Sequence, residues 1–88
     1  MITIWKYKIG LGITPILMPE GAKILTAQVQ GIDTMTIWAL VNPEKEMVNR
    51  RIYCVGTGEE DNEVDPDRLI YIGTMQICSY VWHAFELV

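Results

Sequence analysis

Residues 34–41 read Thr34-Met35-Thr36-Ile37-Trp38-Ala39-Leu40-Val41, and this stretch decides the fold. It carries no charge, is rich in β-branched and aromatic side chains, and is apolar at both odd and even positions. Such residues favour strands, and a strand that is apolar on both faces must be covered on both faces. We therefore expect 34–41 to lie at the centre of a sheet or barrel.

Further strand patterns flank this stretch and are separated by turns rich in glycine and proline. Strands are expected at Thr3–Ile9, Ile13–Met18, Ala22–Gln30, Thr34–Val41, Val48–Val55, Arg68–Cys78 and Val81–Leu87. Pro15 cannot donate a backbone hydrogen bond, so its strand should be an edge strand. No segment shows a helical apolar period of sufficient length. The chain is therefore predicted to be one all-β domain, residues 1–88, forming a small antiparallel β-sandwich or barrel of about six to seven strands.

The chain holds more apolar material than one small core can cover. It has 88 residues, and half of them are hydrophobic. A chain of this size buries only roughly 60–65% of the surface that its unfolded form exposes. Because monomers usually expose little contiguous apolar surface, we expect a homo-oligomer. A monomer with an unusually apolar surface is the alternative.

The sequence also bears on the compartment. No apolar run approaches the roughly 18 residues of a membrane span, and the first residues lack the pattern of a signal peptide. We therefore expect an intracellular protein. Cys54 and Cys78 lie within apolar strand patterns, where free cysteine behaves as a small buried hydrophobe. In a reducing compartment both should be buried thiols without a disulfide bond.

The formal charge of −4 is concentrated in one loop, residues 59–67. This acidic loop contains Glu59, Glu60, Asp61, Glu63, Asp65 and Asp67, and the other five acidic residues face seven lysines and arginines, a balance of +2 (7 − 5). Such a body could accept a small anionic ligand but is too weakly basic to indicate duplex nucleic acid. The loop is either a solvated, mobile segment or a surface that imitates a nucleic-acid backbone.

No catalytic or metal-binding constellation is recognisable. His83 is the only histidine and Ser79 the only serine. Cys78 and His83 share a predicted hairpin, but a nucleophilic pair also needs a hydrogen bond and a third, orienting group. One histidine with two distant cysteines does not match a zinc spacing, and the acidic loop lacks the residue order of an EF-hand. We expect no catalytic residue, no metal and no cofactor.

Gly56-Thr57-Gly58 has two interpretations. Its backbone N–H groups could hold a phosphate, as glycine-rich loops do. Glu59 and Glu60 follow directly, however, and would repel that anion, and no helix follows to add its dipole. The motif is therefore predicted to be the end of a strand.

Polar and aromatic residues within otherwise apolar strands are the candidate ligand-binding residues. They are Gln28, Gln30, Trp38, Arg50, Arg51, Thr74, Gln76, Trp82 and His83. The planar fork of arginine suits phosphate, and the rings of Trp38, Trp82, Tyr53 or Tyr71 could stack on a base. Together these residues could line a pocket for a nucleotide-derived ligand, including one at a subunit interface. The alternative is that strand alternation simply places them on the solvent face.

The order of several motifs resembles a family of small phage and prophage proteins of unknown function. The motifs are Thr3-Ile4-Trp5-Lys6-Tyr7, Met18-Pro19-Glu20-Gly21-Ala22-Lys23-Ile24-Leu25, Gln28-Val29-Gln30, Trp38-Ala39-Leu40-Val41, Val55-Gly56-Thr57-Gly58, Tyr71-Ile72-Gly73-Thr74 and His83-Ala84-Phe85-Glu86. The resemblance spans nearly the whole chain. It implies a phage-encoded accessory protein made in the cytoplasm of a bacterial host, and it transfers no catalytic residue. Small phage proteins of this kind often act against host defence, although fold-level likeness alone does not give function.

The leading hypothesis is a phage-encoded accessory binding protein rather than an enzyme. It would inhibit host antiviral defence by sequestering a nucleotide-derived signal in an oligomeric pocket. One alternative is a protein–protein inhibitor of a host defence protein, or a virion accessory module, that uses an apolar patch or the acidic loop. Another alternative is a small nucleotide-processing enzyme. Neither duplex nucleic acid nor a membrane is expected as a partner.

Overall fold

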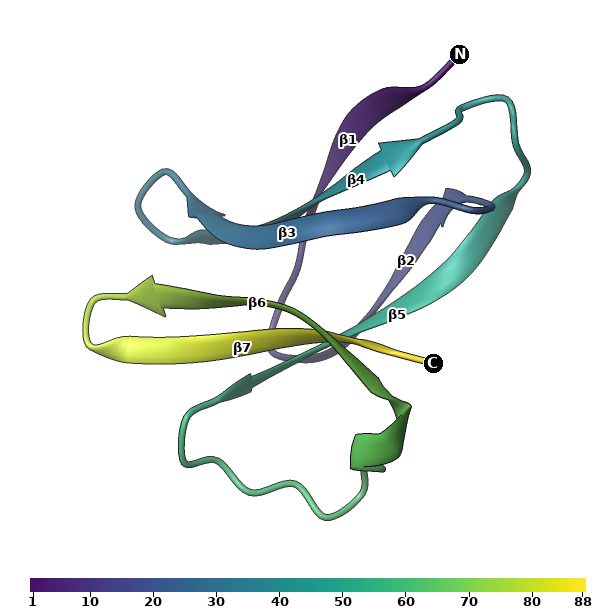
Figure 1. Cartoon of the computed structure of the whole chain (residues 1–88). Helices are drawn as coiled ribbons and strands as arrows, with labels where there is room; N and C mark the ends of the chain where they lie inside the picture. The colour runs from purple at the N-terminus through teal and green to yellow at the C-terminus, as the bar shows by residue number, and fades with distance from the viewer.

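The computed structural model describes residues 1–88 as seven strands in two antiparallel sheets without an α-helix (Figure 1). The strands are β1 (Thr3–Lys8), β2 (Gly12–Pro19), β3 (Lys23–Gln30), β4 (Thr34–Val41), β5 (Met47–Gly56), β6 (Leu69–Ile77) and β7 (Tyr80–Leu87), and a short 3₁₀ turn, η1 (Pro66–Arg68), precedes β6. The first sheet has the order β1-β4-β3 and the second β2-β5-β7-β6. The all-β prediction is confirmed, and the sheets do not close into a barrel.

β4 is the central strand of the first sheet, as its apolar residues predict. Its odd-numbered side chains, among them Ile37 and Ala39, are fully buried in the core. Its even-numbered side chains point to the other face, where Trp38 and Leu40 are half-buried. The strand is therefore covered completely on one face and only in part, by neighbouring side chains, on the other.

The predicted strands agree closely with the observed ones. Every strand lies within one residue of its expected limits, and β2, which contains Pro15, is an edge strand as predicted. Cys54 is buried as expected, but Cys78 is exposed, which corrects the prediction of two buried thiols. Ile77 pairs with Tyr80, so Cys78 occupies the first position of a two-residue hairpin loop and has a φ of 54°. Such a loop position requires a positive φ, which places its side chain outside the sheet.

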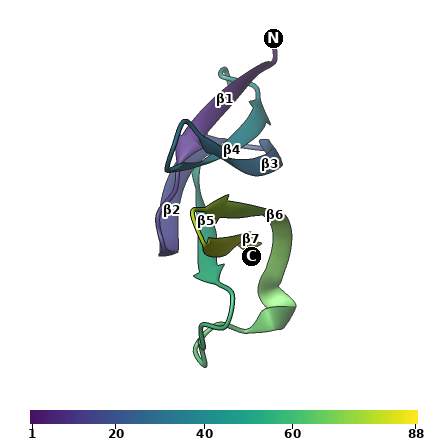
Figure 2. The ribbon, with the colours of Figure 1, turned by 90° about the vertical axis from the view of Figure 1, so that its left-hand side faces the viewer.

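The molecule is thin when seen from the side (Figure 2), and many of its apolar side chains are exposed. Its extents are 40 × 31 × 15 Å. The accessible surface is 5770 Å², whereas a compact protein of this mass exposes about 5,200 Å². The core is a single cluster that joins both sheets, with Met18, Ile37 and Ile52 at its centre. The apolar surplus seen in the sequence therefore lies largely on the surface.

β3 and β6 hold the two sheets together at their closest approach, and Figure 1 shows them side by side. Gly73 of β6 lies directly against the backbone of Ala27 of β3, where an added Cβ would lie 2.9 Å from the carbonyl oxygen of Ala27. The pairing of β6 with β7 shifts register between Tyr71 and Gly73, so a bulge presents this glycine. Backbone cannot give way as a flexible side chain can, so the contact requires glycine.

Gly73→Ala is expected to lower the free energy of unfolding by about 1–3 kcal/mol, since its methyl group overpacks the contact between β3 and β6. Gly10→Ala is the matched control, because its Cβ would meet only the Thr14 hydroxyl at 3.8 Å, and it should change stability by less than about 0.5 kcal/mol. Urea unfolding of both variants measures the difference. Equal stability of the two variants would contradict the close approach.

Candidate functional site

The structure distributes the predicted ligand-binding residues over three surfaces. Gln28, Gln30 and Trp38 lie on the outward face of the first sheet, whereas Arg51, Thr74, Gln76 and His83 lie on the outward face of the second sheet. Arg50 of β5 and Trp82 of β7 occupy the alternate positions of their strands, so their side chains face the interior between the two sheets. The residues therefore do not form one pocket within a single chain.

The outward face of the first sheet is basic. Cross-strand register places Lys6 beside Trp38, and Lys8 and Gln28 on either side of Thr36. Lys23 pairs with Leu40 and so points to the same side. We call this surface the basic face and define it as Lys6, Lys8, Lys23, Gln28, Gln30 and Trp38. Strands β1, β3 and β4 contain no aspartate or glutamate.

Contacts on the basic face leave its charges largely available. Lys6 Nζ donates to Gln30 Oε1 at 3.0 Å, a bond between exposed side chains, and no strand carboxylate neutralises the lysines. A hollow of about 380 Å³ lies at the end of this sheet, lined in part by Lys23, Leu40 and Lys45. Glu20 is the one acidic residue that lines it. The acidic loop lies at the far end of the molecule from the N-terminus (Figures 1 and 2).

Histidine 83 sits in a hydroxyl network on the outward face of the second sheet. His83 Nε2 lies 2.6 Å from Thr57 Oγ1, and His83 Nδ1 lies 3.2 Å from Thr74 Oγ1. The Thr74 hydroxyl is in turn 2.6 Å from the Tyr71 hydroxyl. Both ring nitrogens therefore contact hydroxyl groups rather than the Cys78 thiol, which lies in the hairpin loop.

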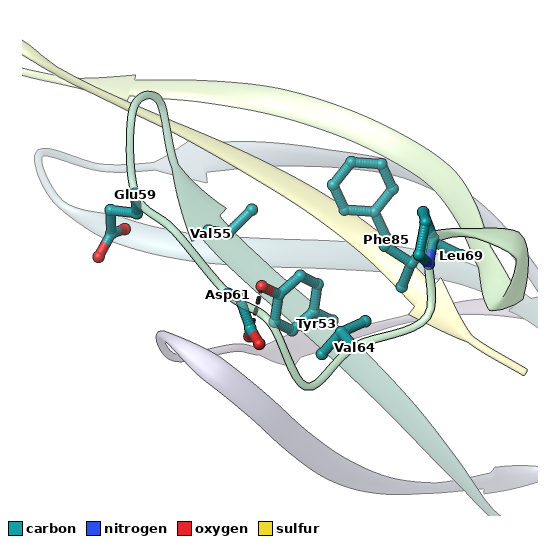
Figure 3. A pocket seen from close by; sticks show the side chains of 8 residues that line it. Tyr53, Val55, Glu59, Asp61, Val64, Leu69 and Phe85 are labelled. Carbon is teal, nitrogen blue, oxygen red and sulfur yellow. Dashed lines mark hydrogen bonds between the residues drawn. The ribbon is translucent and has the colours of Figure 1, made fainter.

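An aromatic hollow of about 260 Å³ occupies the same face where the acidic loop folds over the sheet (Figure 3). Tyr53 and Phe85 form its floor, with ring centroids 6.4 Å apart, and Val64 covers it from the loop. Glu59 and Asp61 stand at its rim. The hollow therefore combines aromatic faces with carboxylates, a set that suits a cationic group.

One hydrogen bond ties the acidic loop to this floor. The Tyr53 hydroxyl donates to Asp61 Oδ2 at 2.8 Å, and Asp61 Oδ1 accepts from the Glu63 N–H at 2.8 Å. Burial, with this hydrogen bond and the charge of Asp61, raises the pKa of Tyr53 to about 12. The hydrogen bonds from the Glu63 N–H and from Tyr53 lower the pKa of Asp61. At neutral pH the neutral phenol and the carboxylate therefore hold the loop on the sheet.

The Tyr53 contact is expected to make stability depend on pH in the alkaline range. The phenol of the unfolded chain ionises near its ordinary pKa of 10.0, whereas that of the folded chain ionises near 12. Its contribution is therefore fully present below pH 10 and is lost as the pH rises towards 12. Urea unfolding of the native chain and of Tyr53→Phe, each across this range, measures the effect. The variant should lose stability less steeply, and identical slopes would contradict the assignment.

Arg50 and Trp82 have structural partners. Arg50 forms a two-pronged pair with Glu86, with Nη2 2.8 Å from Glu86 Oε1, and its Nη1 donates to the Ala22 carbonyl oxygen at 2.9 Å. Trp82 packs against the core beside Gly56. Its ring stacks on that of Tyr80, with the two ring centroids 6.2 Å apart. Arg51 instead lies beside Arg68 and the acidic loop in a hollow of about 310 Å³.

Gly56-Thr57-Gly58 closes β5, as predicted. The Gly56 N–H donates to the Glu59 carboxylate, and the Thr57 N–H donates to the Val81 carbonyl oxygen at 3.0 Å. The Gly56 and Thr57 N–H groups are therefore paired within the chain and are not free to hold a phosphate.

Two sets of residues with functional potential escaped the sequence analysis. The first is the lysines of the basic face, Lys6, Lys8 and Lys23, which enter the sequence-based functional predictions only through the net charge. The signal was present, because alternation in 3–9 places Lys6 and Lys8 on one side of the strand. The second is the pairing of Tyr53, which the sequence suggests only as a base-stacking residue, with Phe85. This apposition depends on the pairing of β5 with β7 and leaves no local pattern.

The comparisons with known proteins give a family and nothing more specific. The structure contains no group of three or more histidine, cysteine, aspartate or glutamate side chains that could hold a metal ion. It also contains no helix that is long and apolar enough to span a bilayer. No curated protein and no solved structure matches the chain. A family model described as a domain of unknown function (DUF7352) matches residues 1–88, so the chain belongs to the DUF7352 family.

Proposed function

We propose that the protein is a binding protein whose basic face holds a small anionic ligand that carries a base, such as a nucleotide-derived molecule. The observation that carries this proposal is the gathering of Lys6, Lys8 and Lys23 around the half-buried Trp38 on strands without a carboxylate. In this proposal the two sheets form a sandwich-like arrangement that leaves the basic face open.

The chemistry of the basic face suits such a ligand in three respects. Lysine ammonium groups pair with phosphate oxygens as mobile point charges. The Trp38 ring offers a stacking surface for a base, an interaction worth about 1–3 kcal/mol. The Gln28 and Gln30 amides supply both donors and acceptors to base edges or sugar hydroxyls. Three lysines suit a small ligand better than a duplex, which normally meets a larger basic surface.

The resemblance to small phage proteins gives the proposed biological setting. A phage-encoded protein in the host cytoplasm would act by sequestering a nucleotide-derived signal of host antiviral defence, without a catalytic step. An oligomer would multiply the binding faces available to one assembly. The basic face supports the ligand class, and the biological role rests on the resemblance alone.

The test is retention of a ligand by the purified protein. The protein is incubated with cyclic oligonucleotides and with ADP-ribose-type molecules, freed of unbound ligand, denatured by heat, and the supernatant is analysed by mass spectrometry. The combined variant Lys6→Gln and Lys8→Gln should bind roughly a hundredfold more weakly or worse, because it loses two charged hydrogen bonds that are each worth about 1.5–3 kcal/mol. Arg51→Gln removes a positive charge from the other sheet and should bind normally.

Each outcome of this experiment is informative. Intact ligand released from the native chain, and lost from the lysine variant alone, supports the proposal. Chemically altered ligand indicates the nucleotide-processing enzyme instead. Equal retention by the lysine variant and the native chain, or no retention of any of these molecules, contradicts binding at the basic face.

The aromatic hollow favours a second candidate function, an inhibitor that binds a basic protein. Tyr53 and Phe85 could receive an arginine or lysine side chain, and Glu59 and Asp61 could pair with its charge. An arginine-rich peptide should then bind in low salt, and Glu59→Gln with Asp61→Asn should abolish the binding. Binding that survives both substitutions would exclude the hollow.

A further inference from the structure

Strand β1 is the one edge of the two sheets that has neither a proline nor a register shift, although it carries Lys6 and Lys8. The sheet edges are β1, β3, β2 and β6. β2 carries Pro15, and β3 and β6 each contain a register shift and pack against one another. β1 pairs with β4 without any shift, from Thr3 opposite Val41 to Lys8 opposite Thr36. Such an edge presents unpaired backbone groups that can pair with another strand.

The hydrogen-bond phase of β1 shows which residues face this open edge. The Ile9 N–H donates to the carbonyl oxygen of Met35, which stands opposite it in the register that joins β1 to β4. In an antiparallel ladder alternate residues bond to the same neighbour. Odd-numbered residues of β1 therefore bond to β4, and the backbone groups of Ile4, Lys6 and Lys8 point to the open edge.

Apolar side chains gather at the same edge. Ile2 is 65% exposed, Ile4 is 55% exposed and Trp5 is 36% exposed. Ile4 lies on the same side of the sheet as the basic face, and Trp5 lies on the opposite side. β1 therefore exposes one apolar side chain on each side of the sheet, with free backbone donors and acceptors between them, which is the chemistry of an unpaired sheet strand.

We infer that β1 pairs antiparallel with β1 of a second copy of this chain, around a two-fold axis at Trp5. This register places Trp5 opposite the partner's Trp5 and Ile4 opposite the partner's Lys6. In each facing pair both residue numbers are then odd or both are even. The two side chains of a pair therefore point to the same side of the joined sheet. The backbone groups of Ile4, Lys6 and Lys8 all find partners.

The two neighbouring registers are less favourable. An axis at Lys6 places that lysine opposite the partner's Lys6, and like charges directly opposite destabilise a sheet. An axis at Ile4 places Trp5 opposite the partner's Thr3, so the two exposed tryptophans do not cover each other. The pairing around Trp5 avoids both faults and covers apolar surface on both sides of the sheet. It also joins the basic faces of the two copies into one surface, although the pairing itself does not depend on any ligand.

Cysteine cross-linking tests the register. Trp5→Cys, Ile4→Cys and Lys6→Cys are each made in a chain that also carries Cys78→Ser, which removes the exposed native thiol. In the proposed register the two Trp5 residues face each other as a pair that is not hydrogen-bonded. Such a pair brings its Cα atoms to about 4.5 Å, close enough for a disulfide bond. Under mild oxidation, Trp5→Cys should form a disulfide-linked dimer, and the other two should not.

Sedimentation provides a second test that does not depend on oxidation. The native chain should sediment as a dimer at micromolar concentration, and Trp5→Lys, which places two charges at the axis, should sediment as a monomer with an unchanged circular dichroism spectrum. A native chain that remains monomeric overturns the inference. So does preferential cross-linking of Ile4→Cys or Lys6→Cys, or a Trp5→Lys variant that remains a folded dimer.

Discussion

Ile37→Ala is expected to lower the free energy of unfolding by about 2–5 kcal/mol, because it removes a fully buried side chain from the centre of β4 and leaves a cavity. Ile37 lies where the central strand meets the core that both sheets share. The closely packed neighbours cannot collapse onto the space without moving a strand. Urea unfolding followed by circular dichroism measures the loss.

Trp38→Ala is the matched control in the same strand. Trp38 points to the basic face and is only partly buried, so its removal leaves no cavity within the core and should cost less than the removal of Ile37. The variant should fold and lose the proposed ligand. A larger loss of stability for Trp38→Ala than for Ile37→Ala would show that Trp38 is a core residue rather than part of an open face.

Glu86→Leu is expected to lower the free energy of unfolding by about 3 kcal/mol, because it leaves the Arg50 guanidinium partly buried without its carboxylate. The side chains of Arg50 and Glu86 are 21% and 13% exposed. The pair also raises the pKa of Arg50, chiefly through the hydrogen bond to Glu86, so the guanidinium stays charged at neutral pH.

The double variant Arg50→Met with Glu86→Leu should recover most of this loss, since apolar side chains of similar size can replace a buried ion pair at little cost. Thermal unfolding of the single and double variants measures the coupling between the two residues. If Glu86→Leu unfolds like the native chain, then Arg50 is not held by Glu86 and becomes available as a ligand residue again.

The sequence predicts the strands of this protein well because its strand signals are local. Alternation, β-branched residues and turn glycines lie within a few residues of one another, so the limits of each strand follow. The arrangement of the sheets does not follow. It depends on Gly73 meeting the backbone of Ala27, a contact between strands distant in the chain. For the same reason open sheets could not be distinguished from a closed barrel.

The candidate site is less predictable for a related reason. Polarity within a strand does not say which face a residue occupies in the assembled sheets. Arg50 and Arg51 look alike in sequence, yet one is bonded to Glu86 and the other lies beside the acidic loop. The exposure of Cys78 and the inward direction of Trp82 likewise depend on how β6 and β7 pair in their hairpin.

Backbone NMR during titration with a nucleotide-derived ligand tests the central proposal most directly. Binding at the basic face predicts that amide signals shift in β1, β3 and β4, around Lys6, Gln28 and Trp38, while those around Tyr53 and Phe85 stay in place. Shifts confined to β5, β7 and the acidic loop, or no shifts at saturating ligand, would contradict it.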